Sequence, residues 1–86
     1  MRAIFKVCPN SNETIAFLPD VIANPGMIMS YMHMGRHGEA DREFFYECKH
    51  ASVEQASELL DELAQIYDEG IFVSKRLPNW WSWFQD

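Results

Sequence analysis

Two histidines four positions apart are the first candidates for chemistry in this sequence. His33 and His37 lie in the stretch YMHMGRHGEADREF, with Gly35 between them and Gly38 directly after. Imidazole nitrogens bind divalent metals and transfer protons near neutral pH. In a straight strand, residues four apart share one face because side chains alternate with a period of two. The stretch must therefore be weighed both as a metal or catalytic site and as a polar turn between strands.

A metal site at these histidines would need further ligands. The nearest carboxylates are Glu39, Asp41 and Glu43, any of which could be a third ligand. Structural zinc sites normally carry closer pairs, such as two cysteines separated by two residues, and this sequence has none. The two glycines also argue against a straight run through both histidines. We therefore favour a hairpin turn, and the alternative is a metal-binding or histidine-dependent enzyme at residues 33–37.

The two cysteines, Cys8 and Cys48, do not suggest nucleophilic catalysis. Cys48 and His50 would share a strand face, but the neighbouring cation, Lys49, would point the other way. A nucleophilic thiolate needs a stabilising positive charge. The sequence opens without a secretory signal, so two cysteines in apolar segments predict buried, reduced thiols in a cytoplasmic protein. A Cys8–Cys48 disulfide is the alternative if their strands pair.

The elements that would position these residues form a single α+β domain over residues 1–86. The composition, 48% hydrophobic and 14% aromatic, is typical of a folded chain. Apolar patterns predict five strands, over residues 2–8, 13–19, 27–34, 42–49 and 71–76. The first two should form a hairpin, and residues 35–41 should be the loop before the fourth strand. Alternation places Lys6 on the outer face of the first strand and groups Phe44, Tyr46 and Cys48 on one face of the fourth.

One amphipathic helix follows the fourth strand. Ser52 is a good N-cap, and Gln55 can complete a capping box. Apolar residues recur at helical spacing, namely Val53, Ala56, Leu59, Leu60, Leu63, Ile66 and Tyr67. Gly70 fits the position that ends such a helix. The apolar stripe must pack on a sheet, which predicts a two-layer sandwich in the order β-β-β-β-α-β. The sheet should be mostly antiparallel with about five strands, one main helix on one face and a short aromatic C-terminal segment.

The charge of the chain points to a particular kind of partner. A net charge of −6 argues against direct nucleic-acid binding, which needs lysine and arginine facing phosphates. It permits a basic protein partner, or an acidic inhibitor that mimics nucleic acid. The helix segment, residues 52–70, carries acids and neither lysine nor arginine. Its candidate partner-binding residues are Glu54, Glu58, Asp61 and Glu62, and Asp68 and Glu69 would follow in its last turn.

The C-terminal tail, residues 77–86, is unusually aromatic, with Trp80, Trp81, Trp83 and Phe84 close together. Left in water, these side chains would form an apolar patch of the kind found at interfaces. The tail could cover the sheet face that the helix leaves open, lie in a homodimer interface, or bind another partner. No apolar run reaches the ~18 residues of a membrane span, and no glycine-rich phosphate loop or other cofactor motif occurs.

The stretches YMHMGRHGEA and ASVEQASELLDELAQIYDEGIFVSKR resemble a group of small uncharacterised proteins of phages and other mobile elements. Those proteins combine a Tyr-x-His-x-Gly-x-His stretch with a capped acidic helix and a final basic strand. Tyr31, His33, Gly35 and His37 match that stretch, whereas Arg36 stands where glutamine is expected. The helix lead-in, KHASVEQA, lacks the expected prolines, and the aromatic tail is not a feature of the group. The resemblance implies an accessory factor that acts by protein contact in a bacterial cytoplasm.

We therefore expect a non-enzymatic protein-interaction module, forming a homodimer and using neither cofactor nor metal. Its contact surfaces would be the acidic helix face and the aromatic tail. The hairpin tip is a further candidate surface, consisting of Tyr31, His33, Gly35, Arg36 and His37.

Overall fold

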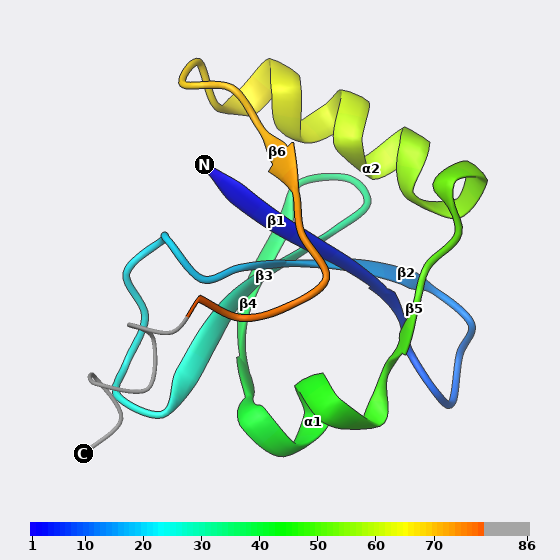
Figure 1. Cartoon of the computed structure of the whole chain (residues 1–86), viewed down its shortest axis with the longest axis vertical. Coiled ribbons are helices and arrows are strands. Elements are labelled where there is room, and N and C mark those ends of the chain that lie inside the picture. Colours follow the sequence, from blue (N-terminus) through cyan, green and yellow to red (C-terminus); the bar gives the residue numbers. More distant parts are fainter. Residues whose placement is uncertain (79–86) are drawn as a thin grey trace.

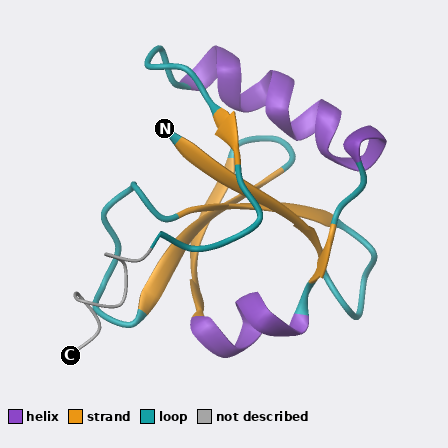
Figure 2. Cartoon of the chain, in the orientation of Figure 1, coloured by secondary structure: helices purple, strands orange, loops and turns teal. Residues whose placement is uncertain are grey.

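The computed structural model describes residues 1–78 of the chain (Figure 1). Four strands come first, β1 (Arg2–Val7), β2 (Thr14–Leu18), β3 (Met27–Met32) and β4 (Arg36–Asp41). They are followed by helix α1 (Arg42–Glu47), strand β5 (Lys49–His50), the main helix α2 (Val53–Ile66) and strand β6 (Phe72–Val73). Figure 2 distinguishes these helices and strands by colour.

The strands form one sheet in the order β4-β3-β2-β1-β5, with β6 also paired to β1. β6 runs parallel to β1, with Ala3 opposite Val73, and the other pairings are antiparallel. β5 pairs with the other end of β1, where Lys6 lies opposite His50. The outer edge of β1 is thus divided between β5 and β6. The predicted α+β class, the mostly antiparallel sheet and the hairpin of the first two strands are confirmed.

Each face of the sheet packs against a helix, with α2 on one face and α1 on the other (Figure 1). The core beneath α2 contains Ala3, Phe5, Ala16, Leu18, Tyr31, Leu59 and Leu63. The core beneath α1 contains Ile4, Cys8, Ile15, Phe17, Ile28, Phe45 and Cys48. Alternate residues of β1 and β2 enter opposite cores, so these central strands are apolar on both faces. The aromatic residues Trp80, Trp81, Trp83 and Phe84, one candidate cover for the second face, lie outside the described residues.

The predicted loop over residues 35–41 is wrong, because the chain reverses earlier and these residues include strand β4. Met32 lies opposite Arg36, so only three residues connect the two strands. Within this turn, Met34 and Gly35 adopt φ values of 67° and 75°. Positive φ at consecutive turn residues matches the twist of a tight hairpin and normally selects asparagine or glycine. A methionine at the first of these positions conceals the turn in the sequence.

The segment expected as the fourth strand is also wrong, since most of it is helix α1. The Asp41 side chain begins the helix by accepting a hydrogen bond from the Phe44 amide at 2.7 Å. Helical spacing then buries Phe45 and Cys48 and leaves Tyr46 66% exposed. The predicted strand face had grouped Tyr46 with the buried residues. A short apolar run fits either period, and here the N-cap favours the helix.

Lys6 is buried under α1, although alternation had placed it on the outer face of its strand. Its side chain is enclosed and only 5% of the residue is exposed. The ammonium donates a hydrogen bond to the Phe45 carbonyl at 2.7 Å and lies 3.7 Å from the centroid of the Phe45 ring. A cation is favoured at this end of a helix and over an aromatic face. Burial disfavours the charged ammonium and therefore lowers the pKa of Lys6. The hydrogen bond and the aromatic contact offset part of this cost, and they join α1 to β1.

Helix α2 begins as predicted. The Ser52 hydroxyl accepts a hydrogen bond from the Gln55 amide at 3.1 Å, and the Gln55 side chain accepts one from the Ser52 amide at 2.8 Å. The helix ends at Ile66, and Gly70, with φ 83°, comes after a further turn. The two acids before Gly70 therefore follow the helix instead of occupying its last turn. Among residues 1–78, no helix is long and apolar enough to cross a membrane.

The two cysteines are free and buried side by side in the core beneath α1. The antiparallel pairing of β1 with β5, which sets Val7 opposite Lys49, ends next to the two cysteines. Burial, and then the neighbouring Cys8, raise the pKa of the Cys48 thiol to about 11. The disulfide alternative required the strands of the two cysteines to pair, but Cys48 ends helix α1 and both thiols are free in this structure.

We expect the thiols of the native protein to resist a disulfide reagent such as DTNB at neutral pH. The raised pKa leaves roughly 100-fold less Cys48 thiolate than an ordinary thiol would supply, and the reagent must also reach a buried atom. Both thiols should react at once in denaturing guanidinium. Single Cys8→Ser and Cys48→Ser variants assign the signal, and rapid native labelling of Cys48 would contradict the described burial.

Candidate functional site

The hairpin tip and the acidic helix, two separate candidates in the sequence, meet in the structure at Glu62. The Tyr31 hydroxyl donates a hydrogen bond to Glu62 Oε1 at 2.5 Å. The Nδ1 atom of His33 lies 2.5 Å from Glu62 Oε2, and the Met34 amide donates to Oε1 at 3.3 Å. One carboxylate on α2 thus binds three groups of the β3–β4 hairpin.

The hairpin presents these groups because of its register and its turn. Tyr31 faces α2 from β3, and only 2% of it is exposed. Its hydroxyl accepts a hydrogen bond from the Gly35 amide at 3.1 Å while it donates to Glu62. The positive φ angles of Met34 and Gly35 turn both of their amides toward this oxygen cluster. The backbone conformation of the turn and the tyrosine–carboxylate contact therefore support each other.

His33 lies between two carboxylates that are one helical turn apart. Its Nε2 is 3.3 Å from Glu58 Oε2, and its Nδ1 is 2.5 Å from Glu62 Oε2. Residues at i and i+4 share one face of a helix, which lets one imidazole reach both. The Glu58 side chain is 80% exposed, whereas that of Glu62 is 33% exposed. Glu62 is thus the enclosed anchor, and Glu58 is the solvent-facing member.

The electrostatics of this cluster favour a permanent anion at Glu62. The hydrogen bond from Tyr31, followed by the one to His33, lowers the pKa of the Glu62 carboxyl. The same Tyr31–Glu62 bond, followed by burial, raises the pKa of Tyr31. Both shifts move away from neutrality, whereas general acid–base catalysis requires a group that titrates near the working pH. The cluster is therefore suited to holding the hairpin in place.

The other residues of the hairpin tip contact different parts of the domain. Arg36 pairs with Glu13 through an N···O distance of 2.9 Å. His37 packs against Tyr31 with ring centroids 4.9 Å apart, and its Nε2 lies 3.0 Å from the Tyr67 hydroxyl. His37 thus faces Tyr67, just beyond the end of α2, whereas His33 faces acids within the helix.

The structure does not gather the proposed metal ligands around the two histidines. Glu39 accepts hydrogen bonds from the backbone and side chain of Asn24, and Asp41 caps α1. Glu43 is exposed in the first turn of α1. Within the described part of the chain, no group of three or more His, Cys, Asp or Glu side chains is arranged to hold a metal ion.

Three of the four acids proposed to bind a partner point to solvent. Glu54, Glu58 and Asp61 are exposed, and Glu62 is directed into the hairpin. Met34, whose amide donates to Glu62, is 93% exposed because it occupies the turn. The sequence reasoning missed Met34. The available signal was a large apolar residue within a turn of polar residues and glycine.

No protein-family model matches this chain, and neither curated proteins nor solved structures include a significant match. The resemblance to proteins of mobile elements stays a prediction. The residues that carry it have distinct structural tasks in this fold. Tyr31 and His33 bind Glu62, Gly35 permits the turn, and His37 packs on Tyr31.

We expect Tyr31→Phe to lower the free energy of unfolding by roughly 1–2 kcal/mol, because it removes a partly enclosed hydrogen bond to a charged group. It also deprives the Gly35 amide of its acceptor. Urea denaturation followed by circular dichroism measures the effect. Tyr46→Phe deletes the same atom from an exposed tyrosine and should change stability by less than about 0.5 kcal/mol. Equal effects of the two substitutions would remove the structural role assigned to the Tyr31 hydroxyl.

We expect the stabilising effect of Glu62 to depend on pH in a defined direction. A carboxyl whose pKa is lowered by folding stabilises the native state above its unfolded pKa, about 4.3. The effect is lost as pH falls through the lowered native value. The stability difference between the wild type and Glu62→Gln, measured by urea denaturation, should therefore be greatest near neutral pH and shrink in acid. Glu54→Gln, at an exposed position, should show little pH dependence; a similar curve for both variants would contradict the assignment.

Proposed function

We propose that this protein is a non-enzymatic protein-binding module. Its contact surface, which we call the acidic ridge, consists of Glu54, Glu58 and Asp61 on α2 together with Met34 at the hairpin tip. The observation that carries the proposal is the Glu62 contact, which holds the backbone of the hairpin tip, including the Met34 amide, against the helix that carries the exposed acids. The partner we propose is basic and supplies an apolar group to meet Met34.

Fixed geometry supports this function. A binding surface that is already ordered loses less conformational entropy when a partner docks. The hairpin tip is held at several points, by the three bonds to Glu62 and by the pairing of Arg36 with Glu13. Met34 therefore lies in a turn whose backbone is held in place by hydrogen bonds, although its own side chain is almost fully exposed.

The charge pattern of α2 supports a basic partner. Stabilising pairs on a helix surface normally place lysine or arginine three or four residues from an acid. The segment from 52 to 70 has neither, and the ion-pair partner given to Glu58 and Glu62 within residues 1–78 is the imidazole of His33. Charge that is left uncompensated on one face attracts an oppositely charged surface and speeds its encounter.

The aromatic tail and the homodimer stay predictions. Trp80, Trp81, Trp83 and Phe84 would add the apolar anchors that interfaces favour, and they lie outside the described residues. The acidic ridge does not require them, so the two surfaces can be tested separately. A cytoplasmic setting and a role in a mobile element likewise remain predictions that follow from the sequence.

Charge reversal tests the acidic ridge. We expect Glu54→Lys/Asp61→Lys to abolish capture of a basic protein from a lysate of the source cells, because it replaces two exposed anions with cations. The matched control is Glu43→Lys/Glu47→Lys on α1, which changes net charge equally on another face. Bound proteins are identified by mass spectrometry at low and high salt. The control should retain the wild-type partner, and raised salt should weaken capture by screening exposed charges.

Met34→Ser tests the apolar part of the ridge without changing charge. We expect it to weaken capture of the same partner while leaving stability within about 0.5 kcal/mol of the wild type, because the side chain is exposed. The ridge proposal fails if both charge-reversal variants lose the partner equally, or if neither variant does. Preserved circular dichroism spectra are needed for each variant, so that loss of binding is not loss of fold.

A further inference from the structure

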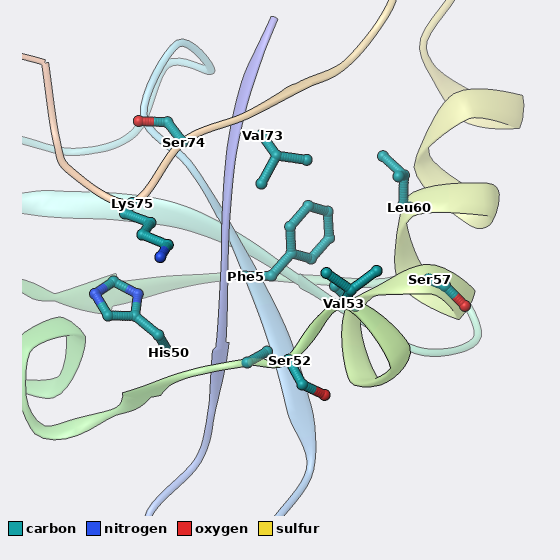
Figure 3. A pocket seen from close by; sticks show the side chains of 11 residues that line it. Phe5, His50, Ser52, Val53, Ser57, Leu60, Val73, Ser74 and Lys75 are labelled. Carbon is teal, nitrogen blue, oxygen red and sulfur yellow. The ribbon is translucent and has the colours of Figure 1, made fainter.

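A pocket of about 200 Å³ opens between the start of α2 and the strands on the outer edge of β1. Its floor includes Phe5 from β1 and Leu60 from α2, and Val73 of β6 closes one side. His50 and Lys75 complete the lining on another side (Figure 3). This pocket is separate from the hairpin cluster, and none of its lining residues belongs to the acidic ridge.

The sheet topology creates the pocket. β6 pairs with Arg2 and Ala3, while β5 pairs with Lys6 and Val7, so the two strands leave a gap along the edge of β1. The Ser74 amide donates a hydrogen bond to the Ala3 carbonyl at 2.9 Å, and the Ala51 amide donates one to the Phe5 carbonyl at 3.0 Å. Beyond these two bonds the chains diverge. The pocket walls are thus fixed to the same strand from both sides.

The lining is mostly apolar, with Lys75 and His50 at one end. Figure 3 shows the Lys75 ammonium close to the His50 ring. Phe5 lies between this pair and the apolar side chains of Val53 and Leu60. Burial lowers the pKa of His50, and the charges of Lys6 and Lys75 lower it further. Two lysines are therefore near enough to act electrostatically on this end of the pocket. The N-terminus of α2, which carries the positive end of the helix dipole, lies at the same pocket.

One lysine, Lys75, lines this pocket in a chain whose net charge is −6. Five of its seven lysines and arginines belong to β1, β5 or the segment after β6, namely Arg2, Lys6, Lys49, Lys75 and Arg76. An apolar ligand with one negative group would match both sides of the lining. The volume lies below the ~300–1,000 Å³ of sites for drug-sized ligands, which limits the ligand to a compact molecule.

We propose that this pocket binds a small monocarboxylic acid with a short apolar body, about the size of phenylacetate. The carboxylate lies at Lys75 and His50, and the apolar body packs on Phe5 and Leu60. A neutral ligand would leave the lysine without a counter-charge, and a simple phosphate would leave the apolar side unfilled. This site does not depend on the acidic ridge, because the two surfaces carry opposite charge and share no residue.

Titration of the full chain, followed by nitrogen–proton correlation spectra, tests the site. We expect phenylacetate to produce saturable shifts at the amides of Ala51 and Ser74, which border the pocket. Phenylacetamide has nearly the same shape without the charge, and it should bind roughly fivefold more weakly, as expected for loss of a partly exposed charge pairing. Absence of saturable shifts with phenylacetate, or equal affinity for the acid and the amide, would overturn the proposal.

Three variants distinguish the contribution of the charge from that of the cavity. Lys75→Gln should weaken phenylacetate and leave phenylacetamide unchanged, whereas Lys49→Gln makes the same charge change at a residue that does not line the pocket and should have less effect. Ala56→Leu inserts bulk into the lining and should abolish binding of both compounds, so the site stays testable if Lys75→Gln unfolds. Equal weakening by the two lysine variants, or full binding to folded Ala56→Leu, would overturn the assignment.

Discussion

The burial and pairing of strand β1 are the constraint on which the rest of this structure depends. Both of its faces are buried, and its edges pair with β2 on one side and with β5 and β6 on the other. Packing of Ala3 and Phe5 places α2, while Ile4 and the buried Lys6 place α1. A small domain buries a limited share of its surface, so one strand that organises two cores uses its apolar residues efficiently. The acidic ridge and the pocket are both defined relative to it.

The Glu62 contact extends this organisation to the far edge of the sheet. β4 is an edge strand, and its pairing with β3 alone would leave the hairpin tip free to move relative to α2. The carboxylate of Glu62 stops that motion by accepting the Tyr31 hydroxyl and holding His33. His33, one of the two histidines that look catalytic in the sequence, thereby helps to position the turn. Paired polar side chains that are partly buried favour one arrangement of the elements they join.

Local signals allowed the main helix and the first hairpin to be predicted, and non-local contacts explain what was missed. The Ser52–Gln55 capping box joins residues only three apart, so it can be recognised in the sequence. The short turn at Met34 is not, because methionine is an unusual residue at positive φ. Because the turn was predicted too late in the chain, strand β4 was expected to be a loop and helix α1 was expected to be a strand. Glu62 could be marked as acidic but not as an anchor, since His33 lies 29 residues away.

The division of the β1 edge between two short strands also bears on the order of folding and on local opening. β6 pairs with β1 across about seventy residues of chain, as Ala3 and Val73 illustrate, so it closes the largest loop in the described fold. Pairings between such distant residues form slowly and tend to come after the local hairpins. β6 is also only two residues long and exposed, and such segments open well below the energy of global unfolding. We therefore expect this wall of the pocket to form late and to exchange its amide protons before the central strands do, which would let a ligand enter without disturbing either core.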